Sequence, residues 1–522
     1  MNTPPAQDRR AAAWAARRLV AFTLLSVAPV ALGQGPVERV NAFYSSIAES
    51  QRSDLVLLPV LAELEQPPIG ADELQQSMLL PAGSSNWDRA ESWATGEPQV
   101  AVLEALDQIT QGEDARTAMA FGQAYGPGVS RALIARGMYT ELGDPPSLSA
   151  ATFGYMPKLD DMACLVHVEA TRRAAAGDVA GALDVLTDWL FFARQMADRA
   201  FMREALWGYS QMMDAFERIR DVAYTDSRGD KALRLEQILA AIARLDDRKI
   251  VGLERLTLPR ADRIAVEQLI GRVFDRTGEL NAGAFSSAMA AVGSNERPLR
   301  LFSEAARWSG AADGHANRTQ TEALLATIAA DFDARWRLDP FEQRHNTPPA
   351  FAQADGNSRM AVIDAAMDDA TVLIAMRQQL RAEAAGTRTA LGIVGFFYQS
   401  VTNFPPTLAS IRPRWTAELE ADPYNPDRGR VRTPPFEYFV PMRDTGAQGG
   451  GPHEMSVVAR DANFSLNLRN DQFVLYSVGP NRSKEWARFV SDDPQAVQGD
   501  YLIWPPVISL LRIDLRQEGL LE

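Results

Sequence analysis

The residues with the greatest chemical reactivity in this chain are few and widely separated. Cys164 is the single cysteine, which excludes an intrachain disulfide, and His167 follows it by three residues. On a helix that spacing puts both side chains on one face. A zinc site needs about four such ligands, and the sequence places no second Cys or His pair beside them. We therefore interpret Cys164 as a small buried residue rather than as a nucleophile or a metal ligand.

Acidic residues are the other group that could carry chemistry. Adjacent aspartates occur at Asp160-Asp161, Asp246-Asp247 and Asp368-Asp369. They lie near expected helix starts or on polar faces, where the helix dipole and solvation account for them without catalysis. The sequence contains no Gly-x-Ser-x-Gly, His-Glu-x-x-His, phosphate-loop or dinucleotide motif. A hydrolase built from this chain would therefore need carboxylates that meet in a groove between domains.

The composition is that of a globular protein, with 46% apolar and 23% charged residues. A chain of 522 residues is too long for one ordinary core, so we expect about two or three domains. The formal net charge is −14. Nucleic-acid binding needs a basic face that displaces counterions, so nucleic acid is excluded as an expected partner.

Residues 1–33 are expected to be a signal peptide. Arginines at positions 9, 10, 17 and 18 precede an apolar run from Leu19 to Leu32, which is too short to span a bilayer comfortably. Small residues around Gly33 suit cleavage, with Gln34 as the mature start. We expect a periplasmic or secreted protein. The alternative is an uncleaved segment that anchors the chain in the inner membrane.

Helical patterns fill most of the chain. We expect an irregular helical region over 34–150 and a helical bundle, or a short solenoid of helical hairpins, over 151–355. Apolar residues from Leu159 onward recur at helical spacing, and Gly177-Asp178 interrupts them. Asp178 is well placed to cap the next helix. The turn resembles that of a tetratricopeptide hairpin, but no repeat of that period follows it.

A different pattern occupies 356–506. We expect a long helix from Ser358 that continues, with a break at Gly386, through Tyr398 and stops at Pro405-Pro406. The apolar period then shifts towards two, which predicts an antiparallel sheet. Its expected strands lie at 436–440, 455–459, 464–468, 473–477 and 501–504. The tail, 507–522, is ambiguous between strand and helix. The predicted fold class is α+β, a mostly helical bundle followed by a small module of one long helix and a sheet.

The order of motifs in this last region is distinctive. It consists of an aromatic helix end, a Pro turn, an Asp-Pro-aromatic segment and a strand ending in Tyr-Ser-x-Gly. These motifs are Phe397-Tyr398, Phe404-Pro405-Pro406, Asp422-Pro423-Tyr424, Phe436-Glu437-Tyr438 and Phe473 to Asn481. The order resembles the C-terminal module of type II secretion major pseudopilins, as found in exported bacterial proteins of unknown function with a helical N-terminal region. The signal-type segment and about 350 residues before the module argue against a filament subunit.

The resemblance implies calcium binding in the loop after Tyr-Ser-x-Gly. The corresponding stretch here offers Asp492, Asp493 and Asp500, and calcium takes six to eight oxygen ligands. Arg482 and Lys484 lie in the same stretch and favour a solvated loop with salt bridges. Both interpretations stay open, and no other cofactor is expected.

These observations favour a non-enzymatic envelope protein, a scaffold or interaction protein whose partners are other envelope proteins. Contact with a membrane would then occur only through an uncleaved N-terminal segment. The alternative is a secreted hydrolase with carboxylates in an interdomain groove.

Overall fold

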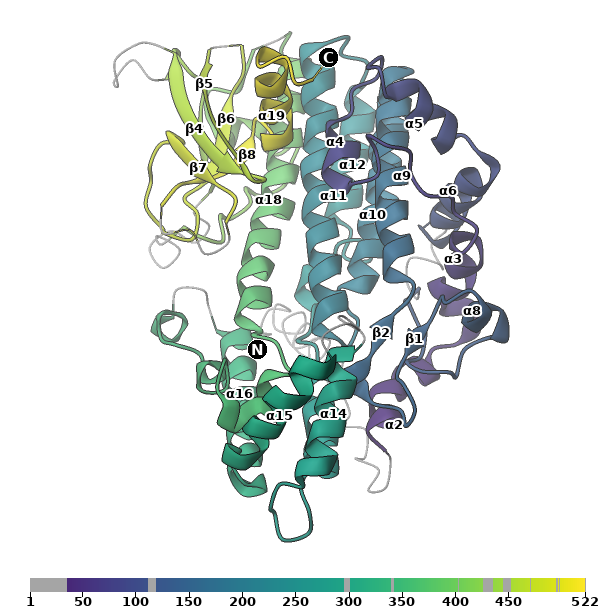
Figure 1. Cartoon of the computed structure of the whole chain (residues 1–522). Helices are drawn as coiled ribbons and strands as arrows, with labels where there is room; N and C mark the ends of the chain where they lie inside the picture. Colours follow the sequence, from purple (N-terminus) through teal and green to yellow (C-terminus); the bar gives the residue numbers. More distant parts are fainter. Residues whose placement is uncertain are drawn as a thin grey trace, which may run out of the picture.

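The computed structural model describes residues 35–521 except 111–118, 295–300, 339–341, 402, 426–434, 445–451, 470, 494, 495 and 497. The expected signal peptide lies outside these residues. The architecture is α+β. A bundle of long helices packs against a small unit of strands that is formed by the C-terminal part of the chain (Figure 1).

Long neighbouring helices form the centre of the molecule. They are α9 (Met156–Ala175), α10 (Val179–Met196), α11 (Met202–Arg228), α12 (Leu235–Asp246) and α18 (Thr371–Gln399). Helix α10 packs against α9 and α11, and α18 packs against α11 and α12 (Figure 1). Gly177 turns the chain between α9 and α10 with φ +84°, and the Asp178 carboxylate accepts a hydrogen bond from the Gly181 amide at 2.9 Å. The predicted cap is therefore confirmed, and the short turn makes the two helices antiparallel neighbours.

Shorter elements cover the sides of the bundle. Figure 1 shows most of the N-terminal helices along α9 and α10, on the side away from the strands, and a second group at the lower end of the bundle. The N-terminal helix Leu74–Leu79 instead lies against α9 and the C-terminal helix, and Pro36–Asn41 lies at the lower end. The first group is α2 (Pro36–Asn41), α3 (Ser53–Leu61), α4 (Leu74–Leu79), α5 (Trp87–Ala94), α6 (Glu97–Thr110) and α8 (Arg131–Ala135), with the short strands β1 (Thr140–Glu141) and β2 (Thr152–Phe153). The second is α13 (Ala261–Val273), α14 (Ala282–Ser294), α15 (Leu301–Gly314), α16 (Arg318–Arg337) and α17 (Ala361–Asp364).

The long helix that the sequence places from Ser358 begins later. Ser358–Met360 is a 3-10 turn, α17 ends at Asp364, and α18 begins at Thr371. The Asp369 carboxylate accepts a hydrogen bond from the Thr371 amide at 2.9 Å. Such local bonds compete with helix formation, which explains why the prediction was wrong here. Helix α18 then runs through Gly386 without the expected break. A Cβ at this position would lie 2.7 Å from the Ile503 side chain, so the glycine lets β8 pack closely against the helix.

The C-terminal unit, defined as residues 437–517, contains two small sheets. Its elements are β3 (Glu437–Phe439), β4 (His453–Ala459), β5 (Ala462–Leu468), β6 (Val474–Ser477), β7 (Phe489–Ser491), β8 (Tyr501–Trp504) and α19 (Val507–Gln517). One sheet has the order β3-β6-β8 and is antiparallel. The other has the order β5-β4-β7, with β7 parallel to β4. The five predicted strands are confirmed, but the single antiparallel sheet is corrected to two sheets, one of them mixed.

Apolar burial joins the bundle and the C-terminal unit. One continuous cluster of buried side chains extends from Val40 in α2 to Trp504 in β8. A smaller cluster lies inside the C-terminal unit, between its sheets and α19, and includes Phe439, Tyr476 and Leu510. Within the part of the chain that the structure describes, we find no helix with the length and apolarity needed to cross a bilayer.

Candidate functional site at the junction of the bundle and the C-terminal unit

A polar hollow of about 380 Å³ lies between α11, α18 and the C-terminal unit. We call it the charged groove. Its polar lining comes from all three parts, which are distant in the sequence. These side chains are Asp214, Glu217, Arg220, Gln379, Glu383, Arg460, Ser491, Asp492, Asp493 and Tyr501. The groove therefore gathers carboxylates and arginines where the bundle meets the strands.

Arg460 reaches the groove from a hairpin turn. Ala459 and Ala462 pair across β4 and β5, so Arg460 and Asp461 form a two-residue loop, with φ 51° and 59°. Positive φ at both positions is the geometry of a type I′ turn, which is disfavoured for residues other than Gly, Asn and Asp. Arg460 Nη2 contacts Asp214 Oδ1 at 2.6 Å and Glu217 Oε2 at 2.5 Å. An unfavourable backbone conformation thus aims one arginine at two carboxylates of α11.

The two carboxylates of α11 differ in their electrostatics. Burial raises the pKa of Asp214, and Arg460 only partly opposes this effect. Burial acts in the same direction on Glu217, but Arg460 and Arg220 outweigh it and lower the pKa of that carboxyl. Glu217 also accepts a hydrogen bond from the amide of Ile508 in α19 at 2.8 Å. Glu217 therefore stays ionised and binds both the hairpin and the start of α19.

A second ionic contact joins α11, α18 and β8. Arg220 pairs with Glu383, with Nη2 at 3.1 Å from Oε1, and the Tyr501 hydroxyl donates to the same carboxylate. Arg220 and Glu383 are buried, with exposures of 1% and 2%. Burial raises the pKa of Glu383 despite the favourable charge of Arg220. The Tyr501 hydroxyl and the Arg220 guanidinium thus both donate to the buried carboxylate of Glu383.

A third contact ties α19 to α11 beside the groove. Arg512 forms a two-pronged ion pair with the buried Asp221, at 2.9 and 3.0 Å, and Arg218 and Ser509 also donate to that carboxylate. Burial opposes ionisation of Asp221, but Arg512 and Arg218 prevail and lower its pKa. This contact, with those of Arg460 and Arg220, links every side of the junction.

The Cys164 and His167 pair lies inside the bundle. Cys164 is buried, and burial raises the pKa of its thiol to about 12. Burial and the nearby Arg218 keep the pKa of His167 well below its ordinary value, so its ring is neutral. The interpretation of Cys164 as a small buried residue is confirmed.

Two of the three aspartates suggested for calcium, Asp492 and Asp500, accept separate hydrogen bonds. Asp492 and Asp493 line the charged groove, and Asp492 Oδ2 accepts from the Arg460 amide at 2.9 Å. The buried Asp500 carboxylate accepts from the amides of Ala487 at 2.6 Å and Glu485 at 3.2 Å. Burial raises the pKa of Asp500 to about 7. Among the described residues, no group of three or more His, Cys, Asp or Glu side chains is placed to hold a metal ion. Calcium binding by the aspartates that the resemblance singles out therefore stays a prediction.

Two of the motifs noted in the sequence meet in the structure. The Asp422 carboxylate accepts from the Ser477 hydroxyl at 2.7 Å and from the Val478 amide at 3.2 Å. Gly479 follows with φ +70°, and a Cβ there would lie 2.9 Å from the Gly499 carbonyl oxygen. The Asp-Pro-aromatic segment and the Tyr-Ser-x-Gly strand end therefore form one structural unit. Burial raises the pKa of Asp422 to about 6.

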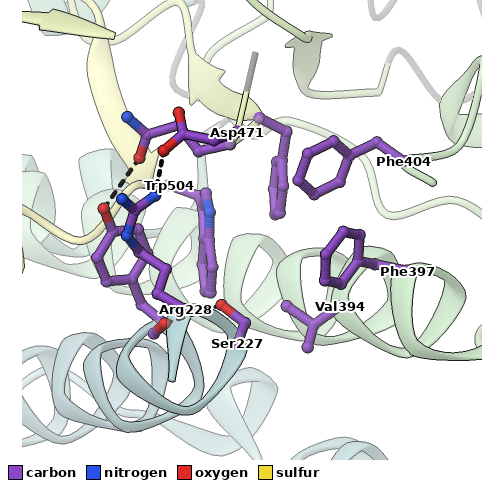
Figure 2. A pocket seen from close by; sticks show the side chains of 10 residues that line it. Ser227, Arg228, Val394, Phe397, Phe404, Asp471 and Trp504 are labelled. Carbon is purple, nitrogen blue, oxygen red and sulfur yellow. Dashed lines mark hydrogen bonds and ion pairs between the residues drawn. The ribbon is translucent and has the colours of Figure 1, made fainter. Parts of the chain in front are cut away.

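A second hollow at the same junction is open and aromatic. We call it the aromatic recess and define it by Arg228, Lys231, Phe397, Phe404, Arg443 and Asp471, which line a volume of about 700 Å³. Figure 2 shows its inner part, where Trp504 lies between the Arg228–Asp471 pair and the rings of Phe397 and Phe404. The Arg228–Asp471 ion pair is 2.9 Å long, and its side chains are 41% and 54% exposed.

Sequence reasoning missed most of the residues in both hollows. A hollow does lie between the bundle and the C-terminal unit, but its members Asp214, Glu217, Glu383 and Arg460 stood out in no motif. The expected strands at 455–459 and 464–468 were the one available signal for Arg460, because strands this close in the sequence imply a hairpin turn between them. Phe397 and Phe404 were noted only as parts of a helix end and a Pro turn.

Comparison of the chain with protein-family models, with curated proteins and with solved structures finds no match.

Proposed function

We propose that this chain is an exported envelope protein that acts as a non-enzymatic scaffold, and that it presents a pseudopilin-like C-terminal unit to other envelope proteins. The observation that carries this proposal is the ionic network of the charged groove. Arg460, Arg220 and Arg512 each join α11 to another part of the junction. Such a network suits a protein whose task is to hold one surface at a fixed position.

The hydrogen bonds of the groove carboxylates favour a structural role over a catalytic one. Glu217 and Asp214 both accept from Arg460, and Glu383 accepts from Arg220 and Tyr501. Removing one partner of a buried ion pair typically costs about 3–5 kcal/mol, because a charge is left without compensation. Each of these side chains therefore contributes to the union of the bundle and the C-terminal unit.

Site-specific photocrosslinking in the producing cells tests the proposal. A photoreactive residue replaces Trp486 or Val458, which are 42% and 38% exposed in the C-terminal unit. The matched control is Leu55, 40% exposed on α3 at the other side of the molecule (Figure 1). We expect discrete adducts with envelope proteins from the first two positions, and weaker ones when Arg460→Ala loosens the junction. The absence of adducts, or equal adducts from Leu55, would contradict the scaffold proposal.

A second candidate, a secreted hydrolase, is favoured by one observation. The charged groove gathers Asp214, Glu217, Glu383, Asp492 and Asp493 around one hollow. Burial raises the pKa of Glu383, whereas the arginines lower that of Glu217, and opposite shifts are typical of an acid and base pair. Purified protein would be screened against glycans and peptides. Turnover that is lost in Glu383→Gln and Glu217→Gln, but kept in Arg228→Ala, would establish the hydrolase and overturn the scaffold.

A further inference from the structure

The floor of the aromatic recess is a continuous set of rings. Phe397 and Phe404 stack with centroids 4.7 Å apart, and Phe404 meets Phe473 edge to face at 5.6 Å. Phe473 in turn stacks on Trp504 at 4.9 Å. Phe397 and Phe404 are half-buried, whereas Phe473 and Trp504 are buried. The two outer rings therefore offer apolar area to a ligand, and the two inner rings hold them in place.

The rim of the recess is cationic. Among the described lining residues are Lys231, Arg228 and Arg443 and one carboxylate, that of Asp471, in a chain whose formal net charge is −14. Arg443 also pairs with the adjacent Asp444 at 2.7 Å. The Lys231 ammonium lies 5.2 Å from the centre of the Phe397 ring, and within the described residues we find no ion pair for it. Arg228 pairs with the exposed Asp471, and we find no second ion pair for it in the part of the chain that the structure describes. Exposed pairs are weak, so Lys231 and Arg228 are available to an anionic partner.

Two residues that adjoin the recess in the sequence have positive φ and exposed side chains. Val401, just after α18, has φ 56° and is 83% exposed. Met442, which precedes Arg443, has φ 64° and is 42% exposed. Positive φ is a genuine outlier for a β-branched residue such as Val401. Strain of this kind persists where surrounding structure requires it, and it is concentrated at ligand-binding positions.

We propose that the aromatic recess binds a short extended segment of a partner protein that carries an aromatic side chain next to acidic residues. Stacking on Phe404 and Phe397 would hold the aromatic side chain. Carboxylates of the segment would pair with Lys231 and Arg228, in keeping with the positive charge of the rim. This inference rests on the proposed interaction role, because it names the chemistry of one partner.

A phage-displayed library of random linear peptides tests the inference on the purified full chain. Selection runs on the wild type and, in parallel, on Lys231→Glu and Phe404→Leu. Lys249→Glu is the matched control, since Lys249 is an exposed lysine outside the recess. Thermal melting shows that each variant is folded. Enriched peptides are then synthesised with a fluorescent label, and their affinity is measured by anisotropy.

We expect the wild type and Lys249→Glu to enrich peptides in which Asp or Glu adjoins Phe, Tyr or Trp. Lys231→Glu and Phe404→Leu should each weaken their binding at least about tenfold. The inference would be overturned if Lys231→Glu bound the peptides as tightly as the wild type. It would also be overturned if the wild type enriched basic peptides, enriched acidic peptides that lack aromatic residues, or enriched no peptide more than the variants do. Adducts from Trp486 or Val458 in the crosslinking experiment would still support the scaffold, so the two failures are distinguishable.

Discussion

The charged groove and the aromatic recess lie at the same junction and are formed by the same three parts of the molecule. They differ in how far their ion pairs are exposed to solvent. In the groove, the Arg460 and Glu217 side chains are 17% and 11% exposed. In the recess, those of Arg228 and Asp471 are 41% and 54% exposed. Ion pairs held away from water fix the two parts together, whereas ion pairs in water exchange readily with other partners. The comparison thus separates a contact that holds the molecule together from a surface that can receive a ligand.

The largest expected effect comes from breaking the groove. Arg460→Ala leaves Asp214 and Glu217 without their arginine, so we expect a loss of about 3 kcal/mol in the free energy of unfolding, the lower end of the range for buried pairs. The matched change in the recess, Arg228→Ala, should cost less than about 1 kcal/mol. Urea unfolding of both variants measures the difference. Equal losses would remove the distinction between the two regions.

The pH dependence of stability offers a second test, within the C-terminal unit. Burial raises the pKa of Asp500 to about 7 in the folded protein, against about 4 in the unfolded chain. Between these values the folded state holds a proton that the unfolded state has released, so the free energy of unfolding decreases as pH rises. We expect the wild type to lose stability more steeply from about pH 4 to pH 7 than Asp500→Asn, as followed by urea unfolding. Parallel pH profiles for the two proteins would show that Asp500 titrates normally.

A milder substitution tests whether the recess serves binding more than stability. Phe404→Leu keeps an apolar side chain but loses the stacking on Phe397 and the edge contact with Phe473. Aromatic pairs contribute about 0.5–1.5 kcal/mol, so we expect a stability loss of about 1 kcal/mol together with loss of binding to the selected peptides. A loss as large as that of Arg460→Ala would mean that the recess holds the fold together as strongly as the groove does.

The smallest expected effect is that of calcium. The carboxylates of Asp492 and Asp500 already accept hydrogen bonds from backbone amides, and calcium needs six to eight oxygen ligands. We expect the melting temperature to stay the same when calcium or a chelator is added. A rise in melting temperature that is specific to calcium and lost in Asp492→Asn would establish the site that the pseudopilin resemblance implies.

The parts of the fold that follow from local pattern could be predicted from the sequence. The helical period from Leu159 and the turn at Gly177-Asp178 define α9 and α10, and the cap on Asp178 is present as expected. Alternating apolar residues locate the longer strands. Strand β7 was missed because it has only three residues and pairs with β4 in parallel, so neither its length nor a nearby turn marks it.

The candidate sites could not be predicted, because they depend on contacts over long distances in the chain. Arg460 and Asp214 are 246 residues apart, and Arg220 and Glu383 are 163 residues apart. Neither contact has a periodic or motif signature. The predicted start of the long helix was wrong for a local reason. The Asp369 carboxylate accepts the hydrogen bond of the Thr371 amide, which a backbone carbonyl would accept in a continuous helix. The spacing of apolar residues does not reveal where a side chain takes the place of a backbone acceptor.

Hydrogen exchange of the β4–β5 hairpin, compared with that of α11, tests most directly whether the charged groove fixes the two parts together. In the wild type, we predict that the hairpin and the groove-facing part of α11 open together, with similar protection. In Arg460→Ala, protection of the hairpin should fall by about a hundredfold, since each 1.4 kcal/mol corresponds to a factor of about ten. Arg228→Ala should leave it nearly unchanged. A hairpin that exchanges independently of α11 in the wild type, or that is indifferent to Arg460, would contradict the account.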